Sequence, residues 1–225
     1  GLAETRDALA ERGIGFVLRR GEPDAVAAEL AERAALVVTD RGYMPVQRRW
    51  RERAARALQV PLIEADTDAV VPVDTASSKA EFAARTLRPK IHRNLDRFLV
   101  PLRPATVLVP DPSPRLGGEA WRTPDELLGR LRVDRSAGRV DGFPGGSAAA
   151  HRLLRRFVDH KLAEYGELRG DLAIDRQSHL AAFLHFGQIS PLEVALAVRD
   201  SAAPRAAVDA FLEQLIVRRE LALNF

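Results

Sequence analysis

Hydrophobic and polar positions alternate between two periods along the first part of the chain. Apolar residues recur at helical spacing in three segments, at residues 2–13, 22–34 and 43–58. Short apolar runs, often β-branched, lie between and after them and predict strands at residues 14–18, 35–40, 60–66 and 69–73. Short buried strands that alternate with helices favour a parallel sheet covered by helices on both faces.

The pattern changes from residue 77 onward. Residues 77–99 predict a helix with Ser77 as its cap and Pro89 as a kink or boundary. The stretch 101–143 is rich in proline and glycine, with one short helix candidate at 123–132, and it predicts a linker region. Helical periodicity then dominates to the end of the chain, in segments at residues 147–170, 178–187, 191–201 and 204–225.

These patterns predict two domains of different class. Residues 1–100 form a partial, Rossmann-like α/β domain with a parallel sheet, residues 101–143 a linker region, and residues 144–225 the beginning of an all-α domain. The chain starts without Met inside a helical pattern and stops inside another, so we expect a piece of a longer protein.

The composition narrows the class of protein without naming a function. The chain is 46% hydrophobic and 29% charged, as is ordinary for a globular protein, and it has neither an 18-residue apolar run nor a signal peptide, so we expect a cytoplasmic protein without membrane contact. No cysteine and no HExxH spacing is present, so no metal site is indicated. A balance of 34 basic against 31 acidic side chains permits a nucleic-acid partner but does not demand one.

The stretch QSHLAAFLHFGQISP, residues 177–191, joins two helices through a glycine. Ser178 is expected to cap the helix that follows, and its start would attract a phosphate. Ala181 would permit close approach of a bulky ligand, and Ser190 with Pro191 would begin the next helix after a stop at Gly187. Taken alone this pattern is more often structural than functional, and the chain contains no Walker A or GxGxxG motif.

Two further patterns place polar residues on helices. In FLEQLIVRRELALNF, Gln214 and Arg218 lie one turn apart on a polar face that either is solvated, the more frequent case, or lines a pocket. Tyr165 precedes Arg169 by four residues, so the ring and the guanidinium would share a helix face. A tyrosine at the edge of the core is the simpler interpretation of that pair.

Read together and in order, these segments resemble class II cyclobutane pyrimidine dimer DNA photolyases along nearly the whole chain. The resemblance covers VVTDRGYMPVQRRWRE, VVPVDTASSKAEFAARTLRPKIHRNLDRFL, FPGGSAAAHRLLRRFVDHKLAEY, SHLAAFLHFGQISP and FLEQLIVRRELALNF. It identifies the all-α part as the beginning of a flavin-binding domain.

The resemblance implies a cofactor, a partner and roles for ten residues. It implies FAD, a possible antenna chromophore of unknown identity in the N-terminal domain, and monomeric action on DNA that contains pyrimidine dimers. FAD contacts fall on Tyr165, Gln177, Ser178, His179, Leu180 and Ala181. DNA contacts fall on Arg169, Arg218 and Arg219, and Glu220 would be the catalytic residue that hydrogen-bonds the pyrimidine edge.

The chain also departs from the family pattern. Ala181 and Ala182 stand where Ser-Pro is usual, and Leu223 stands where an aspartate is usual. Three other hypotheses therefore stay open: a cryptochrome-like flavin photosensor, a degenerate remnant that binds nothing, and a generic nucleotide-binding α/β module.

Overall fold

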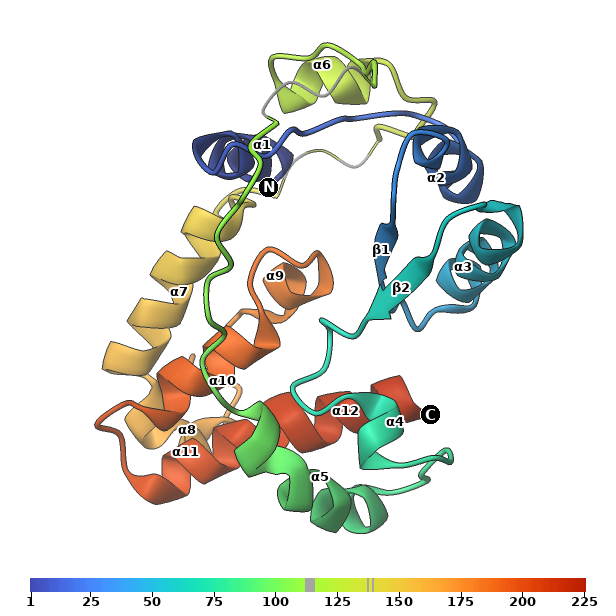
Figure 1. The fold of residues 1–225 in the computed structure, drawn as a ribbon. Coiled ribbons are helices and arrows are strands. Elements are labelled where there is room, and N and C mark those ends of the chain that lie inside the picture. Colours follow the sequence, from blue (N-terminus) through green and yellow to red (C-terminus); the bar gives the residue numbers. More distant parts are fainter. Residues whose placement is uncertain (112–115, 137, 139) are drawn as a thin grey trace. The chain divides into compact units, whose positions relative to one another are not determined.

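The computed structural model describes residues 1–225 except 112–115, 137 and 139 (Figure 1). The chain divides into two compact units. Unit 1 comprises residues 1–38, 45–63 and 104–146, and unit 2 comprises residues 39–44, 64–103 and 147–225.

A two-stranded parallel sheet is built from β1 (Val37–Asp40) and β2 (Leu62–Ala65). The N–H of Val37 donates to the carbonyl of Pro61 at 3.0 Å, and the N–H of Arg41 donates to that of Ala65 at 2.8 Å. The constant offset between these pairs defines the parallel register. Helix α3 (Pro45–Ala57) makes the crossover between the strands, so the predicted α/β class is confirmed.

The other helices of unit 1 follow the predicted pattern closely. They are α1 (Leu2–Glu11), α2 (Pro23–Ala31) and α6 (Pro124–Gly129). Pro23 occupies the first turn of α2, where its missing N–H costs nothing. Thr123 caps α6 by accepting a hydrogen bond from the N–H of Glu126 at 3.2 Å.

The strand predicted at residues 14–18 is not present. Ile14 makes one isolated parallel bridge with Asp111, and the carbonyl of Leu18 accepts from the N–H of Glu119 at 2.8 Å. Arg19 donates to the carbonyls of Leu116 and Gly117. The apolar run is thus extended and held by single contacts with Asp111 and Glu119, rather than by the continuous ladder that defines a strand.

The strand predicted at residues 69–73 is also wrong. Val70 and Val71 are buried but irregular, and α4 (Val73–Ala76) begins where the strand should end. The N–H groups of Val70 and Val71 donate to the side chain of Glu220 instead of to a neighbouring strand. The segment is apolar because it is buried. Its N–H groups are satisfied by the carboxyl of Glu220 and not by a neighbouring strand.

Unit 2 is mainly helical and holds the larger hydrophobic core. Its longer elements are α5 (Ala84–Phe98), α7 (Ser147–His160), α8 (Leu162–Leu168), α10 (Pro191–Arg199), α11 (Arg205–Leu212), the π-helix η1 (Glu213–Arg218) and α12 (Arg219–Asn224). Phe157, Tyr165 and Phe211 pack ring against ring at the centre of α7, α8 and α11, with centroids 4.7 to 5.7 Å apart. Residues 204–225, predicted as one helix, therefore contain a π-helical segment.

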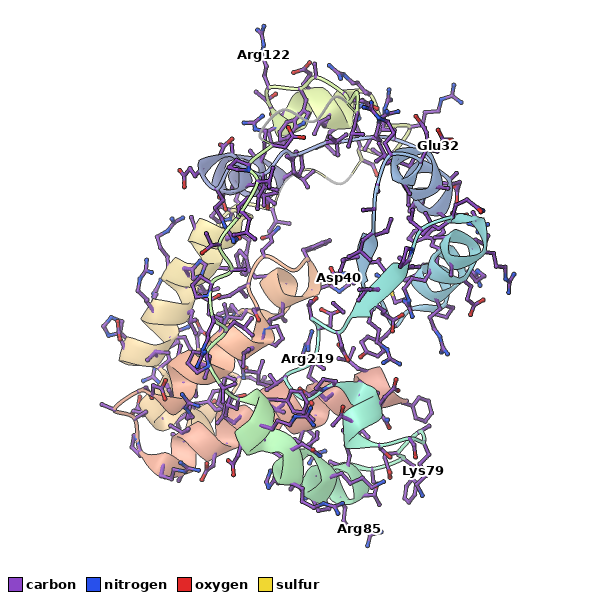
Figure 2. The ribbon with its side chains drawn as sticks, viewed as in Figure 1. Glu32, Asp40, Lys79, Arg85, Arg122 and Arg219 are labelled. Carbon is purple, nitrogen blue, oxygen red and sulfur yellow. The ribbon has the colours of Figure 1, made fainter. Side chains whose placement is uncertain are left out.

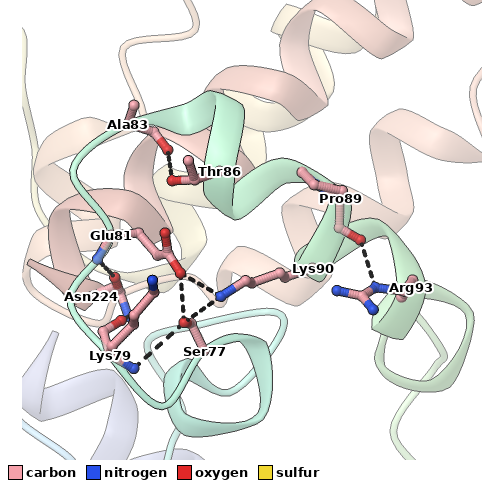
Figure 3. Close-up of polar contacts among 9 residues, drawn as sticks. All are labelled: Ser77, Lys79, Glu81, Ala83, Thr86, Pro89, Lys90, Arg93 and Asn224. Carbon is pink, nitrogen blue, oxygen red and sulfur yellow. Dashed lines mark hydrogen bonds and ion pairs between the residues drawn. The ribbon is translucent and has the colours of Figure 1, made fainter.

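The helix predicted at 77–99 begins later, at Ala84, and continues through Pro89. Residues 77–83 instead form a polar network that Figure 3 shows. Ser77 Oγ donates to the Glu81 carboxylate at 2.8 Å, and Lys90 Nζ donates to both side chains. Asn224 accepts from the N–H of Glu81 at 2.6 Å and donates to the carbonyl of Lys79 at 3.1 Å.

This network lowers the pKa of a buried acid, Glu81. Glu81 is only 2% exposed, and the hydrogen bond from Lys90 is the main reason that its pKa falls to about 2. A paired and hydrogen-bonded carboxylate can be buried at low cost. Through Asn224, the same network joins α12 to the segment before α5.

The compact units cut the chain at other places than the predicted domains. Residues 64–103 group with the C-terminal helices, and residues 104–146, which include most of the linker predicted at 101–143, group with the N-terminal segments. Contacts such as that of Arg12 with the carbonyl of Ala105, at 2.9 Å, show that this stretch packs within unit 1.

The aromatic group in unit 2 predicts a large stability difference between two phenylalanines. Phe157→Ala should lower the free energy of unfolding by about 3–5 kcal/mol, because Phe157 is 1% exposed and its removal leaves a cavity between Tyr165 and Phe211. Phe186→Ala is the matched control, since Phe186 is 71% exposed, and should cost under about 1 kcal/mol. Urea unfolding followed by circular dichroism measures both, and equal losses would contradict this packing.

Candidate functional site

The connection between α8 and α9 (Ala181–His185) carries most of the residues predicted to contact FAD. Tyr165 packs its ring in the core, while its hydroxyl forms a hydrogen bond with the side chain of Arg169. The two side chains share a helix face, as predicted. Gln177 Nε2 donates to the carbonyl of Arg169 at 2.6 Å and so joins the two ends of the connection. Burial raises the pKa of the Tyr165 hydroxyl.

Ser178 does not cap a helix in the way predicted. Its Oγ accepts from the N–H of Leu180 at 3.4 Å, and α9 begins only at Ala181, with no side-chain cap. His179 lies between them with a φ of +54°, and a left-handed residue cannot be part of a right-handed helix. Leu180 turns its side chain into the core, where it is 1% exposed. The second half of the prediction is confirmed, because Gly187 adopts φ +62° after α9 and Ser190 caps α10 through the N–H of Leu192.

Hydrogen bonds among Lys161, Asp175 and His179 hold this connection in place. Asp175 accepts hydrogen bonds from Lys161 Nζ at 2.6 Å and from His179 Nε2 at 2.7 Å. These two hydrogen bonds, that from Lys161 first, lower the pKa of Asp175 to about 2. Lys161 stands between α7 and α8 and also donates to the carbonyl of Gln177 at 3.3 Å.

Glu220, the predicted catalytic residue, is buried, whereas the predicted role requires that it contact a pyrimidine. Its carboxyl is 2% exposed, and Oε1 accepts from the N–H groups of Val70 at 2.6 Å and Val71 at 3.2 Å. The second oxygen, Oε2, is buried and has no hydrogen-bond partner among the described residues. In this structure Glu220 anchors residues 70 and 71 and offers no surface to a DNA base, because its side chain faces inward.

Burial makes Glu220 a weak acid. Desolvation raises its pKa to about 8, although the two N–H groups and Arg219 oppose this shift. The Asp66 carboxylate adds to the increase. Asp66 is itself engaged: its Oδ2 accepts from the Tyr43 hydroxyl at 2.5 Å and from the N–H of Val73 at 3.2 Å.

Two of the three arginines predicted to contact DNA, Arg218 and Arg219, differ in how free their side chains are to bind a phosphate. Arg219, labelled in Figure 2, binds the main-chain carbonyl and the carboxylate of Asp68. Arg218 has a 56% exposed side chain and one 3.4 Å contact with Glu213, which pairs mainly with Arg88. Consecutive residues of a helix point in different directions, so Arg218 can face solvent while Arg219 faces Asp68.

Asp68 lies beside both His185, at the end of α9, and Arg219. Burial is the main influence on its pKa and raises it, whereas Arg219 and His185 lower it. Asp68 also pairs with Arg219.

Sequence reasoning missed the residues that position this site. Asp175 lies outside all the motifs that carry the resemblance, Lys161 lies in one of them without a predicted role, and Arg88 lies 125 positions from Glu213. Only the spacing of Asp175 and His179, four residues apart, gave a local signal. The remaining contacts join residues that the chain separates widely.

The fold is that of photolyases and cryptochromes. The fold resembles a class III photolyase from Agrobacterium tumefaciens, with a TM-score of 0.71 and 21% identity over 100% of this chain and 48% of that chain. It also resembles a Synechocystis cryptochrome, with a TM-score of 0.67 and 19% identity over 92% of this chain and 46% of that one. At these identities the likeness shows the fold alone.

Sequence comparison identifies the family. Residues 1–112 match the DNA photolyase family model. The whole chain is 39% identical to a deoxyribodipyrimidine photo-lyase of Methanothermobacter thermautotrophicus, covering 48% of it, and 31% identical to that of Potorous tridactylus, covering 43% of it. The chain belongs to the photolyase and cryptochrome family, and it spans about half the length of the curated relatives that it matches.

The residues of the α8–α9 connection fit the phosphates of FAD in their chemistry. Lys161 supplies an ammonium and Ser178 a hydroxyl, both of which suit phosphate oxygens, whereas the Nε2 proton of His179 is donated to Asp175. The side chains of Ala181 and Ala182 add no hydrogen-bond donor.

Within the part of the chain that the structure describes, we find no helix that could serve as a membrane span.

The buried carboxyl predicts an unusual pH dependence of stability. The pKa of Glu220 is raised in the folded state, so its contribution is complete below about pH 4.5 and is lost as pH rises toward 8. The free energy of unfolding should fall by about 2–4 kcal/mol between pH 5 and pH 8 from this group. Glu220→Gln should remove that slope, because an amide does not ionise, and Glu167→Gln on the exposed face of α8 is the control. Urea titrations at four pH values test this, and an unchanged slope in Glu220→Gln would contradict the buried neutral acid.

Proposed function

We propose that this chain is part of a class II DNA photolyase, which binds FAD and uses light to split cyclobutane pyrimidine dimers in DNA. The observation that carries the proposal is the 39% identity, over the whole chain, with an archaeal protein named deoxyribodipyrimidine photo-lyase. The class II assignment rests on the motif resemblance of five segments in order, residues 37–52, 70–99, 143–165, 178–191 and 211–225. A cytoplasmic, monomeric enzyme and an antenna chromophore in the N-terminal domain remain predictions.

The residues of the α8–α9 connection would hold the cofactor. Ser178 and the main chain of His179, with Lys161 beside them, would meet the phosphates, and the Tyr165 hydroxyl with Arg169 would close one side. Gln177 would act on the cofactor indirectly, because its side-chain amide, its N–H and its carbonyl are already bonded to Arg169, Asp175 and Lys161. When bound, reduced FAD would supply the light-driven electron that opens the dimer.

The chain's own arginines would supply affinity for DNA independent of base sequence. Phosphate contacts of this kind suit an enzyme that must act on a lesion anywhere, and flipping the damaged dimer out of the duplex would cost a few kcal/mol. Arg169 and Arg218 have exposed side chains that could reach a backbone phosphate. Glu220 could take the predicted catalytic role only after its contact with Val70 and Val71 opened.

A cryptochrome-like photosensor is the second candidate. The burial of Glu220 favours it, because the group proposed to read the lesion is directed away from solvent. The fold likeness to a cryptochrome is compatible with it as well. Such a protein would bind the same flavin and pass its signal to a protein partner.

Repair of a defined lesion separates the two candidates. The full-length protein, purified with its flavin, should remove a single thymine dimer from an oligonucleotide under blue light and leave it intact in the dark. Loss of dimers is measured by chromatography. Flavin absorbance without repair would favour the photosensor, and absence of flavin from the full-length protein would contradict both.

The difference between two neighbouring arginines gives a second test. Arg218→Gln should weaken DNA binding and reduce the slope of log K against log salt by about 1, because one phosphate contact is lost. Arg219→Gln should leave that slope unchanged and reduce stability, because its guanidinium is already bound to Asp68. Fluorescence anisotropy at several salt concentrations measures the slopes, and the opposite order would contradict this assignment.

A further inference from the structure

His179 has an unusual backbone conformation. Among the described residues it is the one non-glycine with a positive φ, at +54°. Left-handed backbone costs an ordinary side chain roughly 1–2 kcal/mol, and a glycine does not have this cost. The strain persists only where surrounding contacts hold the residue in place.

Asp175 supplies those contacts. Its Oδ1 accepts from His179 Nε2 at 2.7 Å and from the N–H of Gln177 at 3.2 Å. A carboxylate is an acceptor only, so the imidazole must carry its proton on Nε2. Two of the four residues after Asp175 are therefore tied back to it.

Lys161 fixes this arrangement to the helical core. Its Nζ donates to Asp175 Oδ2 at 2.6 Å and to the carbonyl of Gln177 at 3.3 Å, and its side chain is 13% exposed. The residue before α8 thus holds both ends of the 175–177 segment. Removing the carboxylate would release Lys161, Gln177 and His179 together.

We propose that Asp175 is a positioning residue for flavin binding, which holds His179 in its left-handed conformation and so shapes the segment 177–181 before the cofactor arrives. This rests on the proposed function, because it takes that segment to be the place where the FAD phosphates bind. Asp175 itself need not touch the cofactor. A preformed segment gives higher affinity because the cost of ordering is met during folding.

A double-mutant cycle on the full-length protein tests the proposal. Asp175→Ala should weaken FAD binding to the apoprotein roughly five- to thirtyfold, which is the strain of left-handed backbone converted at about 1.4 kcal/mol per tenfold change. His179→Gly in the same chain should restore most of that affinity, because glycine adopts the conformation without being held. Quenching of flavin fluorescence on binding measures the dissociation constants.

The controls separate positioning from general damage. Glu167→Ala removes an acid of the same charge from α8 and should leave the dissociation constant unchanged. If Asp175→Ala does not fold, Asp175→Asn takes its place in the cycle, and the coupling with His179→Gly is again the decisive quantity.

Three results would overturn the proposal, and they are distinguishable. If Asp175→Ala binds FAD as tightly as the unsubstituted protein, the carboxylate does not position the segment. If His179→Gly gives no recovery and the two effects are additive, Asp175 acts by some route other than the backbone of His179. If the unsubstituted full-length protein binds no flavin, the proposed function fails and this inference fails with it.

Discussion

The contact of the Glu220 carboxyl with the N–H groups of Val70 and Val71 is the constraint around which unit 2 is organised. It joins residues 149 and 150 positions apart, and it satisfies two buried backbone donors that no sheet or helix satisfies. Desolvation makes this position costly for a charged acid, so the neutral form is favoured there. Oε1 thus joins α12 to residues 70 and 71, while Oε2 has no hydrogen-bond partner among the described residues.

The polar network at Ser77 acts on the same helix from its other end. Asn224, one turn after Glu220, bonds the backbone of Lys79 and Glu81, and Lys90 neutralises the buried Glu81. The beginning and end of α12 are thus both tied to the segment that precedes α5. Arg219 and Asp68 pair directly beside the Glu220 anchor, so Arg219 has little freedom, while Arg218 faces solvent.

The α8–α9 connection is held mainly by charged side chains. It must hold several residues outside regular structure, with polar groups directed outward and only Leu180 in the core. The carboxylate of Asp175 and the ammonium of Lys161 do this with a few charge-assisted hydrogen bonds, which are stronger than neutral ones. A connection shaped in this way suits a ligand with several phosphate oxygens, and it agrees with membership of the photolyase and cryptochrome family.

Local pattern by itself determined much of the secondary structure. The helices at 2–11, 45–57 and 191–199 and the strands at 37–40 and 62–65 follow from periodicity, capping residues and β-branched runs, because these act over a few neighbouring positions. The same local rules failed at residues 14–18 and 69–73. An apolar run reports burial, and a buried segment becomes a strand only if another strand lies beside it.

Tertiary structure alone decided the character of the candidate site. The motifs located Tyr165, Arg169 and residues 177–181 near one another, but not the left-handed His179 or the contacts of Lys161 with Asp175, which need a fold to meet. Glu220 could be singled out from the sequence, yet its inward orientation depends on two N–H groups from the other end of the chain. Residue type is visible in the sequence, whereas accessibility and hydrogen-bond partners are set by contacts between segments that the sequence keeps far apart.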